Sequence, residues 1–333
     1  MITRSFHRAA TTLAAAALGA AALAPGAAAA AGSYPAQPIR LIVPYAAGGG
    51  PDVLARKTAD ALAKVLKANV IVENKVGAGG ILAGEYVARA QPDGYTLMQG
   101  ASSHVVQKIL QPTVNFDPLA DFTHIVRDAF LPQVLVVRSD APYQSVQELI
   151  AAARKADNPF NFASGGIGSA AHLAGAAFSD AAKAKTVHVP YRGSVEIVPS
   201  LLRGDVQFAF PVASTALAHI ADGKVRPLAV TAGARLPQLP DVPTLNEVFD
   251  TDALVLDAWS GVWAPKGLSP EITATLEKAF KEVYAQPEIQ QFYAQAGAPM
   301  DVSASPAEFT QFIKAETAKY QKIIDDNGIK VDQ

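Results

Sequence analysis

Residues 39–56 constrain the fold of this chain more than any other stretch. They begin with a short apolar run, Ile39–Val43, which is typical of a strand buried on both faces of a parallel sheet. Pro44 ends the run because proline cannot donate to a central ladder, and three glycines follow at positions 48, 49 and 50. From Pro51 onward the apolar residues recur with a helical period. The pattern predicts a strand, a glycine loop and a helix N-terminus.

Two interpretations of this glycine loop stay open. A loop without side chains leaves backbone N–H groups accessible at the positive end of a helix dipole, which suits an anionic ligand. The simpler alternative is a tight turn in which the glycines only reverse the chain. Asp52 stands in the first turn of the helix, where a carboxylate complements the dipole, so we expect it to have a structural role.

The first 31 residues have the order of a cleaved secretory signal. Arg4 and Arg8 precede an apolar stretch, residues 9–24, and a run of alanines ends at Ala31. The two arginines are not adjacent, which favours the general secretion route. The apolar stretch is short and rich in alanine, so we do not expect it to span a membrane. Cleavage near Ala31 removes two positive charges, which takes the net charge from -2 to -4.

Composition excludes several classes of protein. Of 333 residues, 50% are apolar and 17% charged, which is typical of a globular chain with a large core. There is no basic or acidic tract, so we expect no nucleic acid and no acidic membrane surface as partner. The absence of cysteine excludes a disulfide, a thiolate metal site and a lipid anchor on cysteine. We therefore expect a soluble protein in an exported compartment.

Strands alternate with helices along the remaining chain, which argues for mainly parallel sheets flanked by helices. Residues 111–124 are rich in Pro, Asp and Phe and are expected to be irregular. Helices are expected to start at Ser145, where Glu148 completes a capping box, and at Ser169, Ser269 and Ser305. The strands are predicted at residues 39–43, 70–73, 95–98, 134–137, 160–163, 186–189, 206–210, 228–231 and 258–264.

Two lobes follow from this order. The last two helices must bury their apolar faces against a sheet, and the nearest candidate is the first sheet. We therefore expect residues 32–132 and 257–333 to form lobe 1 and residues 133–256 to form lobe 2. Two crossings between rigid lobes make a hinge, and the cleft between the lobes is the natural site for a small molecule.

The opening pattern recurs in the second lobe. Residues 162–169 read as a strand end, a glycine and serine loop, and an N-cap serine. The simpler interpretation of Ser169 is an ordinary helix cap, and His172 is expected to be a packed or capping residue. Even so, two helix N-termini that open on one cleft from opposite lobes can hold a carboxylate from both sides.

A third strand end contributes Tyr191 and Arg192. Tyr191 can line the cleft, while Arg192 either pairs with an acid or stays solvated. Residues 77–80 lack the third glycine and the acidic residue of a dinucleotide fingerprint, and no P-loop, nucleophile elbow or His-Glu-x-x-His motif is present. The five histidines beyond the signal lack metal-ligand spacing. We expect no catalytic residue, no metal and no cofactor.

Together these segments resemble the Bug/TctC family, the extracytoplasmic solute receptors of tripartite tricarboxylate transporters. The resemblance covers essentially the whole mature chain in one order. The matching segments are Tyr34-Pro35, Pro38-Ile39-Arg40, Val43-Pro44-Tyr45-Ala46, Gly48-Gly49, Asp52, Ala55-Arg56, Val72-Glu73-Asn74, Gly77-Ala78-Gly79-Gly80, Pro92-Asp93-Gly94-Tyr95-Thr96-Leu97, Ser164, Gly166, Gly168-Ser169, His172-Leu173, His188-Val189-Pro190-Tyr191-Arg192-Gly193-Ser194, Leu228-Ala229-Val230-Thr231, Leu239-Pro240-Asp241-Val242-Pro243-Thr244, Trp259, Gly261 and Ala264-Pro265.

The resemblance implies a periplasmic, two-lobe Venus flytrap fold of type II that binds a small carboxylated solute. It implies membrane permease subunits as partners, and we expect a monomer. In this family backbone amides, hydroxyls and ordered waters hold the carboxylate. The positions that correspond here are Tyr45, Ala46, Ala47, Gly48 and Gly49 in lobe 1, with Ser102 and Ser103 as a weaker assignment, Ser164, Gly165, Gly168 and Ser169 in lobe 2, and a side wall of Tyr191, Arg192 and Gly193.

Two positions depart from the expected pattern. Pro211 stands where many family members have an aspartate that meets a ligand amine or lies near the ligand, which favours a plain, partly apolar carboxylate over an amino acid. Pro199 falls inside an expected helix, where it should remove a backbone bond and kink the chain.

Two other functions are alternatives to capture for transport. The liganded receptor can instead, or in addition, signal to a membrane histidine kinase, and the sequence does not separate these roles. A secreted hydrolase or isomerase would need a nucleophile with a base, and the sequence shows no such set.

Overall fold

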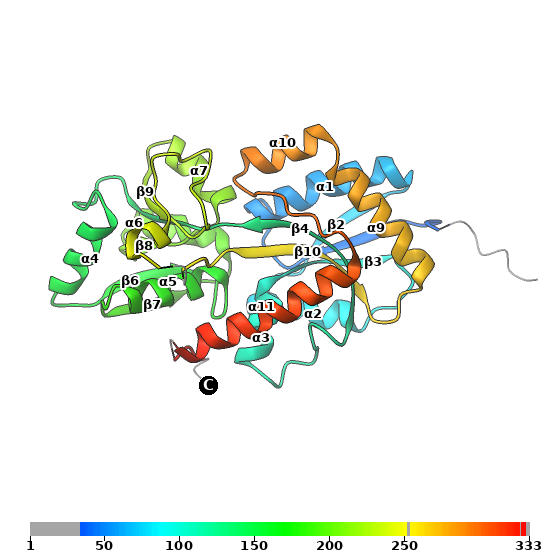
Figure 1. Cartoon of the computed structure of the whole chain (residues 1–333), viewed down its shortest axis with the longest axis horizontal. Coiled ribbons are helices and arrows are strands. Elements are labelled where there is room, and N and C mark those ends of the chain that lie inside the picture. Colours follow the sequence, from blue (N-terminus) through cyan, green and yellow to red (C-terminus); the bar gives the residue numbers. More distant parts are fainter. Residues whose placement is uncertain (1–33, 252–253, 327, 331–333) are drawn as a thin grey trace, which may run out of the picture.

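The computed structural model describes residues 34–251, 254–326 and 328–330. The predicted signal segment lies outside the described residues. Two five-stranded sheets organise the chain, and helices flank each of them (Figure 1). The expected α/β class with two lobes is confirmed.

The first sheet, in lobe 1, has the strand order β2-β1-β3-β10-β4. β1 pairs in parallel with both β2 and β3, whereas β10 is antiparallel to both β3 and β4. The apolar residues of β1 are buried, as predicted for the run at residues 39–43. The strands are β1 (Ile39–Val43), β2 (Val70–Asn74), β3 (Thr96–Ala101), β4 (Phe122–Leu131) and β10 (Ala258–Pro265).

The second sheet, in lobe 2, repeats this plan with the order β7-β6-β8-β5-β9. β6 is parallel to β7 and β8, and β5 is antiparallel to β8 and β9. The strands are β5 (Val134–Arg138), β6 (Phe160–Ser164), β7 (Thr186–Pro190), β8 (Phe208–Ala209) and β9 (Val225–Val230).

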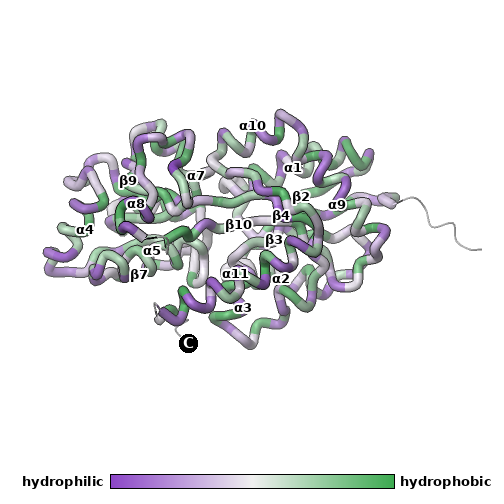
Figure 2. The backbone as a smooth tube through the Cα atoms, in the orientation of Figure 1, coloured by the Kyte–Doolittle hydropathy of each residue, from purple (hydrophilic) through white to green (hydrophobic). Residues whose placement is uncertain are grey.

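The helices bury apolar faces against these sheets and keep polar faces outward, which Figure 2 shows as mixed colours along the helices at the surface. Helices α9 and α11 both pack on β4 of the first sheet. The helices are α1 (Gly50–Leu66), α2 (Ile81–Ala88), α3 (Ser102–Leu110), α9 (Pro270–Tyr284), α10 (Pro287–Gln295) and α11 (Pro306–Asp326) with the first sheet, and α4 (Val146–Lys155), α5 (Ala170–Ala181), α6 (Ile197–Arg203), α7 (Ala213–Ala221) and α8 (Leu245–Phe249) with the second. Short 3₁₀ turns at Ala78–Gly80 and Ser194–Glu196 precede α2 and α6.

The chain passes between the sheets twice, from β4 to β5 and from β9 to β10. β4 and β10 pair along their whole length, from Ala258 opposite Leu131 to Pro265 opposite Phe122. In Figure 1 these two strands run side by side toward the other lobe. The two crossing strands therefore form one ribbon, and the crossings lie next to each other.

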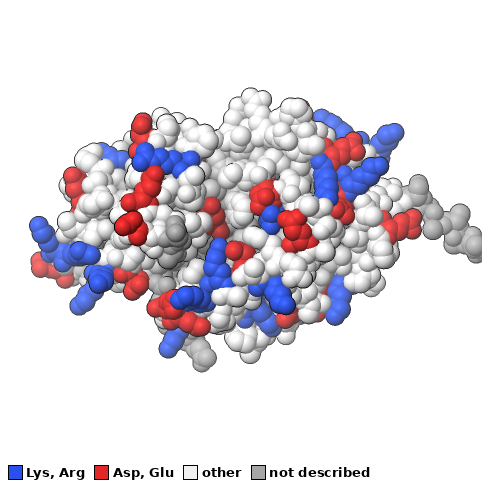
Figure 3. Space-filling model, in the orientation of Figure 1, with Lys and Arg blue, Asp and Glu red and all other residues white. Residues whose placement is uncertain are grey.

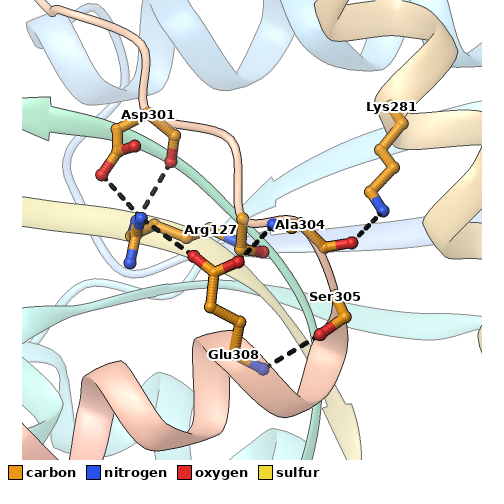
Figure 4. Close-up of polar contacts among 7 residues, drawn as sticks. Arg127, Lys281, Asp301, Ala304, Ser305 and Glu308 are labelled. Carbon is orange, nitrogen blue, oxygen red and sulfur yellow. Dashed lines mark hydrogen bonds and ion pairs between the residues drawn. The ribbon is translucent and has the colours of Figure 1, made fainter.

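Arg127 on β4 fastens the C-terminal part of the chain to the first sheet (Figure 4). Its guanidinium lies 2.6 Å from the Asp301 carboxylate and 3.5 Å from that of Glu308 in the first turn of α11. Glu308 also accepts a hydrogen bond from the Ala304 amide, and Ala304 O accepts one from Lys281 on α9. One buried cation thus joins β4, the loop before α11 and α11 itself.

Several elements differ from the prediction. β4 occupies residues that were partly expected to be irregular, and α3, α7, α8 and α10 were not anticipated. The predicted strand at residues 206–210 is reduced to two residues of β8. Pro199 does not interrupt a helix, because it lies in the first turn of α6, where a backbone N–H has no helical acceptor anyway.

Candidate ligand-binding cleft

A cavity of about 700 Å³ lies between the two lobes. From the first lobe it is lined by the loops that follow β1 and β2 and by the start of α3. From the second lobe it is lined by the loops that follow β6 and β7 and by the start of α5. These are the carboxyl ends of parallel strands, where an open α/β sheet characteristically places its ligand.

The loop between β1 and α1, residues 44–49, is held in shape by Asp52. The buried Asp52 carboxylate accepts hydrogen bonds from Gly48 N at 2.9 Å, from Arg56 at 2.9 Å and from Asn74 at 2.7 Å. Asn74 also donates to Tyr45 O at 2.8 Å. Burial alone would raise the pKa of Asp52, but the Arg56, Asn74 and Gly48 hydrogen bonds outweigh it and hold that pKa below its ordinary value. Asp52 therefore has the structural role that was expected: it holds the loop of residues 44–49.

The loop between β6 and α5, residues 165–169, is held by uncharged groups. Ser164 Oγ accepts from Gly166 N at 3.1 Å and lies 2.9 Å from Gly166 O and 2.5 Å from His188 Nε2. Gly168 N donates to His172 Nδ1 at 3.1 Å. At the start of α5, Ser169 Oγ accepts from the His172 amide, so Ser169 is the helix cap that the sequence predicted.

The two histidines that hold this loop, His172 on α5 and His188 on β7, are stacked and neutral. Their rings lie 3.8 Å apart at an angle of 10°. Burial lowers the pKa of His172 to about 4. Burial, together with the neighbouring His172, lowers that of His188 to about 3. His172 Nδ1 accepts a hydrogen bond, so the ring proton of His172 is on Nε2. The Ser164 hydroxyl donates its own proton to Gly166 O, so in the bond between Ser164 and His188 the donor is His188 Nε2.

The lobes touch each other around the cavity. Gln107 on α3 donates to Ile167 O in the second lobe at 2.6 Å, and Gly50 N lies 3.4 Å from Thr215 Oγ1 on α7. A Cβ on Gly49 would stand 3.5 Å from Val195 Cγ1 across the cleft. The structure therefore presents the lobes in a closed arrangement, with the glycine loops packed against the opposite lobe.

The predicted site residues divide into two groups. Six are not among the residues that line the cavity and belong to the loops or the hinge beside it: Ala47, Gly48, Gly49, Ser164, Gly168 and Pro211. Eight are among the residues that line the cavity: Tyr45, Ala46, Ser102, Gly165, Ser169, Tyr191, Arg192 and Gly193.

Two of the parts of the wall that the prediction missed matter most here. The first is the loop of residues 77–80 after β2, in which all four residues have positive φ. Its sequence fails as a dinucleotide motif and matches the family pattern, but it was given no place in the site; its position after a strand beside β1 is a signal that would have found it. The second is an apolar surface at the lobe crossing, to which Leu131, Phe210, Val212 and Ala258 contribute.

Within the described ranges, no group of three or more His, Cys, Asp or Glu residues is placed to hold a metal ion. No helix among those residues is long and apolar enough to cross a membrane. Positive and negative side chains are interspersed over both lobes on the face drawn in Figure 3.

Comparison with known proteins decides the family. Residues 54–329 match the model of the tripartite tricarboxylate transporter family receptor, TctC. The chain belongs to this family. BugT of Bordetella pertussis is 33% identical over 304 residues, which are 90% of this chain and 92% of BugT. As a member of this family, the protein is a periplasmic solute-binding protein.

Solved structures agree with this family membership. The periplasmic binding protein BugD superposes with a TM-score of 0.84 at 31% identity, over 89% of this chain and 99% of BugD. A protein of R. palustris, solved with adipate, superposes with a TM-score of 0.85 at 29% identity, over 89% of this chain and 99% of that chain. The two-lobe fold is shared with both proteins.

Proposed function

We propose that this TctC family protein captures a small organic carboxylate in the cleft and presents the closed complex to the membrane permease subunits of a tripartite tricarboxylate transporter. The observation that carries the proposal is the pair of glycine loops, residues 44–49 and 165–169, which face one cavity from opposite lobes. A ligand between them gains contacts from both lobes only when the lobes are closed, so binding shifts the equilibrium toward closure.

Backbone donors at the start of α5 suit a carboxylate. Ala170 and Ala171 line the cavity and occupy the first turn of α5, where N–H groups have no acceptor inside the helix. The next amide, that of His172, is already bonded to Ser169. The positive end of the helix dipole adds attraction for an anion at the same place. The adipate-bound relative supports an acid as the ligand class.

The chemistry of the lining supports binding without turnover. Ser164 and His188 are the described pair that most resembles a nucleophile with a base, at 2.5 Å. However, Ser164 is fully buried and its hydroxyl donates to Gly166 O, so it offers no free oxygen for attack on a ligand in the cavity. The pair serves the loop instead, and we propose that the protein is not an enzyme.

Thermal unfolding against a panel of acids tests the proposal. The panel contains di- and tricarboxylates, aromatic and aliphatic monocarboxylates, and amino acids. A ligand at a hundred times its Kd stabilises the fold by about 2.7 kcal/mol, which raises Tm by about 2–4 °C per kcal/mol in a protein of this size. A rise confined to carboxylic acids is the expected result. No rise with any acid, in protein shown by mass spectrometry to carry no bound ligand, would contradict the proposal.

The transport step needs its own test. Deletion of the gene is expected to abolish uptake of the acid that raises Tm, and the intact gene should restore it. Uptake that persists at the normal rate, with loss of a transcriptional response to the acid, would favour a sensing receptor over a transport receptor.

A further inference from the structure

The cavity has two chemically different sides. One side consists of the loop backbones and the helix starts described above, which carry N–H groups and hydroxyls. The other side is an apolar surface at the lobe crossing, which we call the hinge wall. The hinge wall consists of Leu131, Phe210, Val212 and Ala258. Leu131, Phe210 and Ala258 are buried, so their side chains belong to the permanent core around the crossing strands.

The backbone N–H and C=O groups beside the hinge wall are hydrogen-bonded within the crossing strands and their neighbours. Leu131 and Ala258 oppose each other in the β4–β10 ladder, and Val212 bridges to Gln133. Pro211 has no N–H, and its carbonyl accepts from Val134 N at 2.9 Å. The hinge wall therefore presents apolar side chains over a backbone whose hydrogen-bonding groups serve the fold.

Charge is placed away from the hinge wall. Among the described residues that line the cavity, Arg192 is the only one with a charged side chain. It is exposed and follows β7, the edge strand of the second sheet, whereas Phe210 follows β8. β6 lies between these two strands, so their separation is about 10 Å at about 4.8 Å per strand. A carboxylate against the hinge wall would lose its water without gaining a counter-charge, which is costly.

We infer that the ligand is a monocarboxylate with an apolar body, an aliphatic or aromatic acid whose single carboxylate binds the helix starts while its body lies on the hinge wall. This inference rests on the proposed function, because it concerns the same cleft. It differs from the ligand of the adipate-bound relative, since adipate carries a carboxylate at each end. An apolar body gains free energy from burial on the wall, whereas a second carboxylate loses it.

Matched pairs of acids test the inference on the wild-type protein. Isothermal titration at pH 7 compares hexanoate with adipate, which differ in whether the chain ends in a methyl or a carboxylate, and benzoate with terephthalate. We expect the monoacid to bind at least tenfold more tightly in at least one pair. A diacid that binds as tightly as its monoacid, or more tightly, in both pairs overturns the inference and leaves the proposed function standing. If no acid of either pair or of the larger panel binds, both are overturned.

A charge added to the hinge wall sharpens the test. Val212→Lys places an ammonium on the wall, so adipate is expected to gain at least tenfold over hexanoate relative to the wild type. Val212→Met is the matched control, since it adds length without charge and should keep the wild-type preference. Circular dichroism checks that both variants are folded. If folded Val212→Lys keeps the wild-type preference, the far end of the ligand does not lie on the hinge wall, and the assignment is overturned.

Discussion

The two glycine loops that face the cleft are held by different chemistry. In the first lobe, a buried carboxylate, Asp52, bonds Gly48 N and is itself held by Arg56 and Asn74. In the second lobe, the stacked neutral imidazoles of His172 and His188 and the buried Ser164 hold residues 165–168 in place. Both loops follow a strand next to the centre of its sheet, and both lead into a helix that starts at the cavity.

This difference teaches that loop geometry and local charge are separable. Both arrangements occupy glycine amides that would otherwise be free, and so fix which N–H groups remain open to a ligand. The first lobe uses a charge that stays ionised well into the acid range, because its pKa is lowered. The second lobe uses groups that work only while neutral. The two loops should therefore respond differently to substitution and to pH.

The largest effect is expected at Gly168. It has φ +74°, and a Cβ there would lie 2.6 Å from Gln107 Nε2 and 2.9 Å from Leu110 Cδ1 on α3 of the other lobe. Gly168→Val should therefore prevent closure and weaken binding by about a hundredfold, since backbone strain and the blocked contact act together. Isothermal titration with the best acid of the panel measures this loss.

A matched control separates blocked closure from backbone strain. Gly223 also has a positive φ, +66°, but a Cβ there meets nothing within 4 Å. Gly223→Val should reduce stability and leave affinity unchanged. In the first lobe, Gly49→Leu should also weaken binding, because its side chain would press on Val195 across the cleft. Wild-type affinity in both Gly168→Val and Gly49→Leu would contradict the closed-cleft account.

The next effect concerns the charged loop. Asp52→Ala leaves the amide of Gly48 and the amide group of Asn74 without their acceptor, so unfolding free energy should fall by about 2 kcal/mol. Arg56 is half exposed and adds little to this loss. Urea unfolding measures it, with Asp60→Ala, an exposed position on the same helix, as the control expected to change by less than about 0.5 kcal/mol. Equal losses in both variants would refute the role of Asp52.

A pH effect should belong to the uncharged loop. The pKa values of His172 and His188 fall to about 4 and about 3 on folding, so the unfolded chain takes up their protons first as the pH drops below about 6.5. Their contribution to stability is therefore complete above about pH 6.5 and is lost as the pH falls, down to about pH 4 for His172 and about pH 3 for His188. Each imidazole contributes up to about 1.4 kcal/mol per pH unit there.

The double variant His172→Asn with His188→Gln isolates this contribution. Its plot of unfolding free energy against pH should be shallower than that of the wild type between pH 6 and pH 4.5. The Asp52 carboxylate cannot produce this difference, because its pKa is lowered and it titrates at lower pH. Parallel plots for variant and wild type would show that the two imidazoles are not neutral in the folded protein.

The smallest effect separates hydrogen bonding from packing at His172. Asn places its side-chain oxygen near the position of Nδ1 and can accept from Gly168 N, whereas Leu cannot. His172→Leu should weaken acid binding about fivefold to tenfold, the value of one hydrogen bond, while His172→Asn stays within about twofold of wild type. Equal affinity in the two variants would show that the hydrogen bond from Gly168 N to His172 does not contribute to binding and that His172 acts through packing alone.

Much of the fold could be predicted because most of its strands are short apolar runs, and β1 and β6 end in glycine loops. β4 could not, since its buried residues include the polar His124, Arg127 and Asp128. Partners distant in sequence satisfy these polar groups: Ser260 and Gln99 donate to the Asp128 carboxylate, and Asp301 pairs with Arg127. Local pattern cannot reveal such partners, so the strand reads as a polar connection.

The same limit applies to the cleft. The glycine loops were predictable because glycine before a helix has a local meaning. The hinge wall was not, because Leu131, Phe210 and Ala258 are ordinary core residues until the crossing strands bring them together. Ser164, Gly165, Gly168 and Ser169 were assigned to the site through the family resemblance, but the role of His188 in holding this loop required its distance to Ser164.

A crystal structure of the protein with the acid that most raises its Tm tests the central claim most directly. We expect one carboxylate within hydrogen-bonding distance of the Ala170 and Ala171 amides. The ligand should touch both loops, residues 44–49 and 165–169, in the closed arrangement, with its body on the hinge wall. A ligand that contacts only one lobe, or a carboxylate that lies against the hinge wall away from α5, would contradict the account.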